Sequence, residues 1–351
     1  MADVTRIPVP QLETFITRAL EAVAISNDDA RSIAELMVRA DVQGSDGHGV
    51  FRLPQYIRRI MGGAVNIKPN IRIVREAAGM ALVDGDNGMG YLVMRFATEK
   101  AIEKAKKAGV AWVGVRSSNH AGPASLYAVM PLEHDMIGLY LAVGNANHLP
   151  AWGGLDMLLS TNPIAVAIPA LEEKPIVLDM ATSVAAYGKV KTKAQRGELM
   201  PEGWMMDRTG APLTDPKRAD QGFLLPIGGY KGYGLALVFG LLAGTLSGAA
   251  MGRDVVDFNN DDSTPTNTGH AIVAIDLAAF GDVDAFKRRV DTLIRDLRAS
   301  ERMPGVEAVR IPGEGSQRAR EDRMRNGVPI PAALRVALDK LAEELAVPAL
   351  R

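Results

Sequence analysis

The sequence predicts an α/β (mixed α+β) protein, with a central α/β domain at 72–280 and a helical domain built from both chain ends, 1–71 and 281–351. Three observations predict it. Apolar residues recur at helical spacing near both ends, short β-branched runs crowd the middle, and 351 residues exceed what one ordinary core encloses.

The first seventy residues predict three helices. The first carries an apolar stripe, made of Leu12, Phe15, Ile16, Ala19, Leu20 and Val23. Ser26, followed by an acid at Asp29, predicts the N-cap of a second helix that runs to about Ala40. A third helix is expected at about 49–61 and ends at a glycine pair.

The middle of the chain predicts strands. The β-branched runs are 71–74, 80–85, 110–115, 136–143, 164–169, 175–180 and 270–276. Helices are expected at 93–108, 284–300, 317–325 and 331–345. The apolar run 232–251 is long enough to cross a bilayer, but it contains five glycines. We therefore expect a helix buried inside the protein or at a subunit interface, and no membrane span.

Composition excludes several classes of protein. The 40 basic and 41 acidic residues leave a net charge of −1, so a nucleic-acid partner is not expected. The absence of cysteine excludes disulfides, thiolate nucleophiles and sulfur-ligated metals. No apolar stretch of signal-peptide length occurs at the N-terminus, which predicts a cytoplasmic protein.

His48, Arg52 and Tyr56 form the most informative constellation. Their i, i+4, i+8 spacing would stack the three side chains on one helix face, with Pro54 in its first turn or at a kink. An arginine fork can hold a carboxylate, and a histidine one turn away can exchange a proton near neutral pH. The alternative interpretation is the start of a surface helix with an incidental histidine.

His120 follows a predicted strand, at the kind of strand end where sites collect in α/β folds, and it could equally cap the next helix. Two other polar segments are 160–165, which lies beside a predicted strand, and 178–183, which ends one. The stretch 188–196 could be a phosphate site but is more simply a solvated basic loop. The glycine-rich 228–234 is either an anion cradle or a tightly packed helix start.

Neither G-x-G-x-x-G nor a phosphate-binding G-x-x-x-x-G-K-[ST] loop occurs, so the residues alone do not predict a dinucleotide. The five histidines include no H-x-x-x-H pair, so no metal is expected, and G-x-S-x-G is absent.

Taken in order, the segments resemble the malate/L-lactate dehydrogenase family of the second type. That family includes ureidoglycolate and sulfolactate dehydrogenases, 2,3-diketogulonate reductase and the piperideine- and pyrroline-2-carboxylate reductases. The likeness covers about residues 8–345 and rests on DGHGVFRLPQY, SSNHAGPASLYA, STNPIAVAIP, IVLDMATS, GGYKGYGLAL, GHAIVAID and IPGE.

The resemblance implies hydride transfer between NAD(P)H and a small 2-oxo acid, a non-Rossmann NAD(P)-binding domain, and a homodimer with sites near the interface. It implies that His48 or His120 transfers the proton and that Arg52 holds the substrate carboxylate. Tyr56 and Thr161 would line the substrate pocket. The implied nucleotide contacts are Asn145, Asp179, Met180, Ser183, Lys231, Gly232, His270, Gly313 and Glu314.

One departure from the family concerns the first motif, where the usual S-H-G reads Gly47-His48-Gly49. Either Ser45, Asp46 or water replaces the hydroxyl, or the substrate differs. A cyclic imine reductase remains an alternative, as do a non-catalytic nucleotide- or anion-binding protein and a metal-dependent hydrolase. NAD and NADP are not separated, although the cations Lys189, Lys191, Lys193 and Arg196 could serve a 2′-phosphate.

Overall fold

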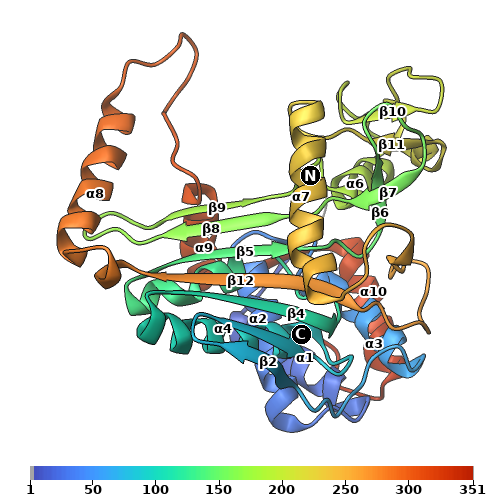
Figure 1. Ribbon diagram of the computed structural model, residues 1–351. Coiled ribbons are helices and arrows are strands. Elements are labelled where there is room, and N and C mark those ends of the chain that lie inside the picture. The colour runs from blue at the N-terminus through green and yellow to red at the C-terminus, as the bar shows by residue number, and fades with distance from the viewer. Residues whose placement is uncertain (1–3, 351) are drawn as a thin grey trace.

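The computed structural model describes residues 4–350, apart from the side chains of residues 195 and 196. Its centre is a seven-stranded sheet in the order β2-β3-β4-β12-β5-β8-β9 (Figure 1). The strands are β2 (Arg72–Ala77), β3 (Met80–Asp84), β4 (Val110–Ser118), β5 (Met136–Ala142), β8 (Ile164–Ile168), β9 (Ile176–Met180) and β12 (Thr268–Asp276). These are the seven runs predicted from the sequence. β3 and β4 are parallel, and each of the other neighbouring pairs is antiparallel.

Helices cover both faces of the sheet, which explains why β12 is buried along its first seven residues. On one face lies α4 (Gly90–Ala108), the connection between β3 and β4, with α2 (Asn27–Val42) beyond it. The other face carries α7 (Tyr230–Ala243), which crosses β5 and β12 (Figure 1).

The two chain ends meet, because β1 (Val4–Ile7) pairs with β13 (Val328–Pro331). The terminal helices are α1 (Val9–Ala22), α2, α3 (Leu53–Met61), α8 (Val283–Ala299), α9 (Glu314–Asn326) and α10 (Ala332–Glu344). They confirm the helices predicted at both ends, including Ser26 as the cap of α2. α8 packs at the end of the β8–β9 hairpin, where Ile294 and Ile311 are buried together. The division into two domains stays a prediction.

A smaller lobe was not predicted. It contains β6 (Asn147–Pro150), β7 (Met157–Ser160), α6 (Tyr187–Arg196), β10 (Met205–Asp207) and β11 (Gly222–Leu224). Its strands have three or four residues, which is too few to show the alternation of apolar and polar residues that predicts a strand. The interpretation of 188–196 as a loop is wrong, since those residues belong to helix α6. Short helical segments elsewhere are η1 (Val50–Arg52), α5 (Ser125–Ala128), η2 (Met130–His134), η3 (Pro216–Gln221), η4 (Thr245–Ser247), η5 (Gly252–Asp254) and η6 (Leu277–Ala279).

α7 corrects part of the prediction for the apolar run. Its small residues Gly232, Ala236 and Gly240, spaced four apart, are buried and allow neighbouring segments to approach the helix closely. The opposite side exposes large apolar residues, including Leu235, Val238 and Leu241. Burial inside this chain is therefore wrong for that side. No helix in the described part of the chain combines the length and apolarity needed to cross a membrane.

Candidate active site

His48 lies in a turn rather than on a helix. After α2 the chain turns through residues 43–49, makes the single 3-10 turn η1, and enters α3 with Pro54 in its first turn. The side chain of Asp41 ties this turn to the end of α2, because its Oδ2 accepts the N–H of Val50 at 2.8 Å. The prediction that His48 shares a helix face with Arg52 and Tyr56 is therefore wrong.

The turn nevertheless brings the two candidate histidines together. The rings of His48 and His120 are stacked, with centroids 5.6 Å apart and planes 13° from parallel. Phe258 also stacks on His120, with centroids 5.0 Å apart and planes 12° from parallel. Two stacked rings thus restrain the plane of His120, and the atoms left to contact a ligand are those on the edge of its ring.

One edge of His120 is occupied and the other is free. Its Nδ1 lies 2.5 Å from the hydroxyl of Tyr56, which is 3% exposed. The Nε2 atom has no hydrogen-bond partner among the residues that the structure describes. A ring that is fixed at Nδ1 and free at Nε2 is arranged to exchange a proton with a ligand.

Arg52 supplies positive charge to the same place. Its Nε donates to the Gly47 carbonyl at 2.9 Å, and its Nη1 donates to Gln55 at 2.8 Å and Asn259 at 3.3 Å. Its guanidinium also lies over the Phe258 ring, 5.2 Å from the centroid. Within the described chain, no carboxylate comes within 4.0 Å of it, and burial lowers its pKa. A largely desolvated cation without a counter-ion is a binding site for an anion, and its planar fork suits a carboxylate.

The protein's own groups favour the neutral form of both histidines. Burial, with a smaller contribution from Arg52, lowers the pKa of His48 to about 4. Burial, then Arg52 and His48, hold the pKa of His120 well below its ordinary value. A bound carboxylate would offset the charge of Arg52 and so make protonation of either ring easier.

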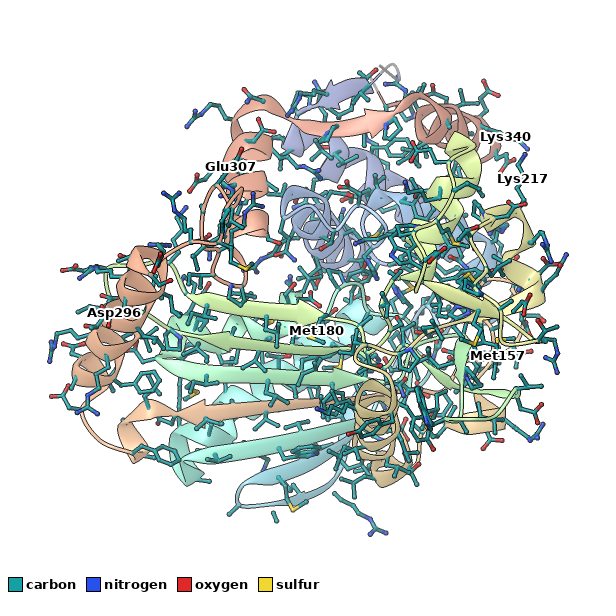
Figure 2. The ribbon with its side chains drawn as sticks, turned by 90° about the horizontal axis from the view of Figure 1, so that it is seen from above. Met157, Met180, Lys217, Asp296, Glu307 and Lys340 are labelled. Atoms are coloured by element: carbon teal, nitrogen blue, oxygen red, sulfur yellow. The ribbon has the colours of Figure 1, made fainter. Side chains whose placement is uncertain are left out.

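Most of the expected nucleotide contacts gather along the edge strand β9. At its start, Val177 donates to the carbonyl of Pro312, which places Gly313 beside the strand. At its end stand Asp179 and Met180, and Figure 2 shows Met180 where the hairpin reaches the middle of the molecule. Beyond that end, Ser183 bridges to Pro226 just before the turn at 228–232.

The residues on this edge fit a dinucleotide. Gly228 and Gly229 have φ of +57° and +66°, which leads the backbone into the N-terminus of α7. Lys231 is exposed there, with no ion-pair partner in the described part of the chain. A helix N-terminus beside a free lysine suits a phosphate. At Gly232 and Gly313, a Cβ would approach backbone atoms of Ile227 at 2.1 Å and Val177 at 3.0 Å, so both positions need glycine.

The other expected contacts, together with Asp179, already have partners within the chain. His270 is 1% exposed in the sheet, where its Nδ1 meets the Tyr140 hydroxyl at 2.7 Å. Asn145 donates to the Thr268 hydroxyl at 2.5 Å, and its carbonyl accepts the N–H of Phe258. The carbonyl of Thr161 accepts from Thr182, and Glu314 pairs with Arg298 at 2.7 Å. Asp179 accepts the N–H of Ser125 at 2.9 Å.

The hydroxyl missing from the first motif has no replacement from a neighbouring side chain. Asp46 is ion-paired with Arg323, and Ser45 makes no side-chain hydrogen bond within the described chain. A Cβ at Gly47 would meet nothing within 4 Å, so this position borders open space.

Sequence reasoning missed Phe258, Asn259 and Tyr91. Phe258 and Asn259 lie in the loop before β12, and Tyr91 is on the first turn of α4. None of them belongs to a spacing pattern that points to chemistry, so their roles become visible only when the chain is folded. The described residues contain no group of three or more histidines and acids able to hold a metal.

A guanidinium that can hold an acid, next to an imidazole that can exchange a proton and an edge that suits a nucleotide, defines a dehydrogenase of small carboxylic acids. The family model for malate/L-lactate dehydrogenase matches residues 7–339, and the chain belongs to that family. It is an oxidoreductase that acts on small 2-hydroxy and 2-oxo acids with a nicotinamide cofactor.

Its relatives span several substrates. Malate dehydrogenase of Pyrococcus horikoshii is 37% identical over 97% of this chain and 96% of that protein. Delta(1)-pyrroline-2-carboxylate reductase of Ancylobacter novellus is 31% identical over 97% of this chain and 98% of the relative. The solved structure of sulfolactate dehydrogenase from Methanocaldococcus jannaschii superimposes with a TM-score of 0.91 at 35% identity, covering 98% of both chains.

Proposed function

We propose that this protein reduces small 2-oxo acids, with Arg52 as the carboxylate clamp and His120 as the proton donor. The observation that carries the proposal is a guanidinium, that of Arg52, with no carboxylate partner in the described chain, beside a histidine whose Nε2 has no hydrogen-bond partner there. His120 is preferred to His48 because its other nitrogen is held by Tyr56, whereas the His48 ring has no hydrogen-bond partner within the described chain.

In the proposed reaction, the cofactor and the side chains have separate roles. When bound, the nicotinamide supplies a hydride to C2 of the substrate. Arg52 holds the carboxylate so that C2 has one orientation, and His120 gives its Nε2 proton to the oxygen as the C=O π bond breaks. In the oxidation direction, the neutral ring takes that proton back. Lys231, Gly232, Ser183 and the Gly313 turn would hold the cofactor along β9.

A cavity of about 230 Å³ adjoins the clamp and offers room for the rest of the substrate. It shares Asn259 with Arg52, and its wall includes His148 stacked on Tyr187 at 4.3 Å. Lys191 also lines it and makes no ion pair within the described chain. Asp257 lines it as well, but its two oxygens accept from Asn259 and Asn260. We infer that Lys191 receives a second anionic group, as in a four-carbon dicarboxylate or a sulfonated 2-oxo acid.

Replacement of Lys191 by methionine tests that inference. The K191M variant should raise the KM for oxaloacetate and 3-sulfopyruvate about tenfold, because it removes one charge contact, and should leave the KM for pyruvate unchanged. Lys189, exposed on the same helix, is the matched control. An equal effect on all three acids would contradict a subsite for a second anion. A rise in the KM for NADPH alone would instead assign Lys191 to the cofactor phosphate.

The function itself is tested by oxidation of NADH and of NADPH with a panel of acids. The panel contains pyruvate, oxaloacetate, 2-oxoglutarate, 3-sulfopyruvate, diketogulonate and the cyclic imines of proline and lysine breakdown. Turnover of an oxo acid supports the proposal and selects the cofactor. Turnover of the imines alone would favour the cyclic imine reductase, and cofactor binding without any turnover would favour a non-catalytic binding protein. The side chain of Arg196, one of the candidate cations, lies outside the described residues.

We further propose a homodimer formed through the outer side of α7. That side exposes Leu235, Val238 and Leu241, and Leu246 extends it beyond the helix. Apolar side chains gathered along one helix commonly mark an interface. The cytoplasmic location stays a prediction.

A further inference from the structure

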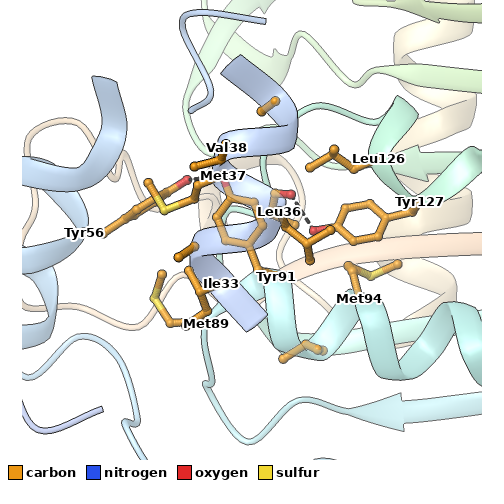
Figure 3. Close-up of a cluster of buried hydrophobic side chains, with 14 of the residues drawn as sticks. Ile33, Leu36, Met37, Val38, Tyr56, Met89, Tyr91, Met94, Leu126 and Tyr127 are labelled. Carbon is orange, nitrogen blue, oxygen red and sulfur yellow. Dashed lines mark hydrogen bonds between the residues drawn. The ribbon is translucent and has the colours of Figure 1, made fainter. Parts of the chain in front are cut away.

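We propose that Tyr91 is a positioning residue that stabilises the protonated form of His120 through Tyr56, an inference that rests on the proposed role of His120. Tyr91 comes from α4 and Tyr56 from α3, and Figure 3 shows the two side chains meeting at their hydroxyl ends. Their oxygens are 3.4 Å apart, and the Tyr56 oxygen is 2.5 Å from Nδ1 of His120.

The direction of the hydrogen bonds begins at Tyr91. Its hydroxyl lies 2.8 Å from the carbonyl of His48, which can only accept a hydrogen bond. The single proton of Tyr91 is therefore committed, and its oxygen faces Tyr56 as an acceptor. Tyr56 has one proton as well, and it can give that proton either to Tyr91 or to His120.

Protonation of His120 removes that choice. A doubly protonated ring carries a hydrogen on Nδ1, so Nδ1 must donate and Tyr56 must accept. Tyr56 then has to donate its own proton to another atom. Within the described chain, the only other hydrogen-bond acceptor near its hydroxyl is the oxygen of Tyr91. Tyr91 is 0% exposed and Tyr56 is 3% exposed, so the two hydroxyls are shielded from bulk water. When His120 is charged, each of the two hydroxyls therefore has an acceptor for its proton, and only the long contact of 3.4 Å from the Gly122 N–H to Nδ1 is given up.

The same side chain links the two histidines. Tyr91 holds the backbone of His48 while it supports the ring of His120, and the two imidazoles stack at 5.6 Å. The turn that carries His48 thereby orients Tyr91 as an acceptor. This gives His48 a role through its carbonyl and its ring face, without a second proton donor in the site.

The test is the pH profile of the Y91F variant. Loss of the acceptor should move the limb governed by His120 toward lower pH by about half to one unit, a three- to tenfold change in the protonation equilibrium. A merely structural defect would lower the rate at all pH values and leave the limb in place. Thr98→Val is the control, because Thr98 is also fully buried on α4 and its hydroxyl bonds only its own helix.

A double-mutant cycle shows whether Tyr91 acts through Tyr56. In a Y56F background, Y91F should have no further effect on the limb, and two additive shifts would overturn the proposal. An unshifted limb in Y91F alone would overturn it as well. NMR of ring-labelled histidine in the protein without ligands, with His120 assigned by its absence from H120Q, follows the same pKa without any substrate. The NMR result therefore separates failure of this inference from failure of the proposed reaction.

Discussion

Arg52 is the residue on which binding of the substrate depends. Replacement by methionine keeps much of its length and removes its charge. The R52M variant should raise the KM for the preferred oxo acid about tenfold to a hundredfold, since a charge-assisted fork contributes about 1.5–3 kcal/mol. Arg58 lies on the exposed side of α3 with Asp262 as its partner, so R58M is the matched control. Steady-state kinetics in which R52M and R58M behave alike would place the carboxylate elsewhere.

Only some of the residues that form the candidate site could be predicted from the sequence. Arg52, His48 and His120 could be singled out because their residue types and local spacing are unusual. Phe258 and Asn259, by contrast, are more than 130 residues beyond His120. They reach the site, at His120 and Arg52 respectively, only because β12 lies beside β4. A single sequence contains no signal for such a contact, because tertiary pairing creates it.

At the scale of elements, the junction of α2 with η1 positions His48. Two glycines flank this histidine and differ in what surrounds them. A Cβ at Gly49 would overlap the carboxylate of Asp41 at 2.0 Å, whereas a Cβ at Gly47 would meet nothing within 4 Å. Neither glycine has a positive φ, so the space around each position, rather than its backbone conformation, decides whether a side chain is tolerated there.

The two glycines form a matched pair of variants. We expect G49A to lose about 1–3 kcal/mol, which is several degrees in Tm, because the turn must move away from Asp41. The G47A variant should melt within a degree of the parent. Thermal denaturation of both variants is the measurement, and equal melting temperatures would mean that Asp41 does not restrain the turn.

The same scale explains what the sequence predicted of the fold. The seven strands of the main sheet could be predicted because each contains a short run of β-branched or other apolar residues. For the outer side of α7 hydropathy left two alternatives, burial inside the chain or at a subunit interface, and the structure leaves only the second, which stays a proposal. Its small residues, spaced four apart, pointed to close packing, and they are buried.

At the scale of the whole molecule, the outer face of α7 predicts the oligomeric state. Val238 is 49% exposed at the middle of this face, so V238D should place a charge in the proposed interface and convert a dimer into a monomer. Val336 is 68% exposed on α10, well away from α7, and V336D serves as the control. Sedimentation of the parent as a monomer, or dimers that survive V238D, would remove α7 as the contact.

The pH dependence of stability also belongs to the whole chain, because its titrating groups are spread over the fold. Burial lowers the pKa values of His48, His148 and His270 to about 4. Unfolding returns each to an ordinary value near 6.5, so between pH 4 and 6.5 the unfolded chain binds more protons and stability rises with pH.

Asp41 acts in the opposite direction, since burial raises its pKa to about 8. Between pH 4 and 8 the folded chain holds the extra proton on Asp41, so this group lowers stability as pH rises. Below pH 6.5 the gain in stability from the three histidines is larger than the loss from Asp41. Above pH 6.5 Asp41 is the only one of these four groups that still changes the stability, and it lowers it. Stability should therefore be greatest near pH 6.5 and fall toward pH 8 by at most about 1.4 kcal/mol per pH unit. Asp41→Asn keeps an oxygen for the N–H of Val50 and removes the titration, so it should flatten the alkaline side and make the rise in stability between pH 5 and 6.5 steeper. Urea denaturation of both proteins at pH 5, 6.5 and 8 measures this. Were the parent as stable at pH 8 as at 6.5, or the decline the same in D41N, Asp41 would have to be ionised in the folded protein throughout this range.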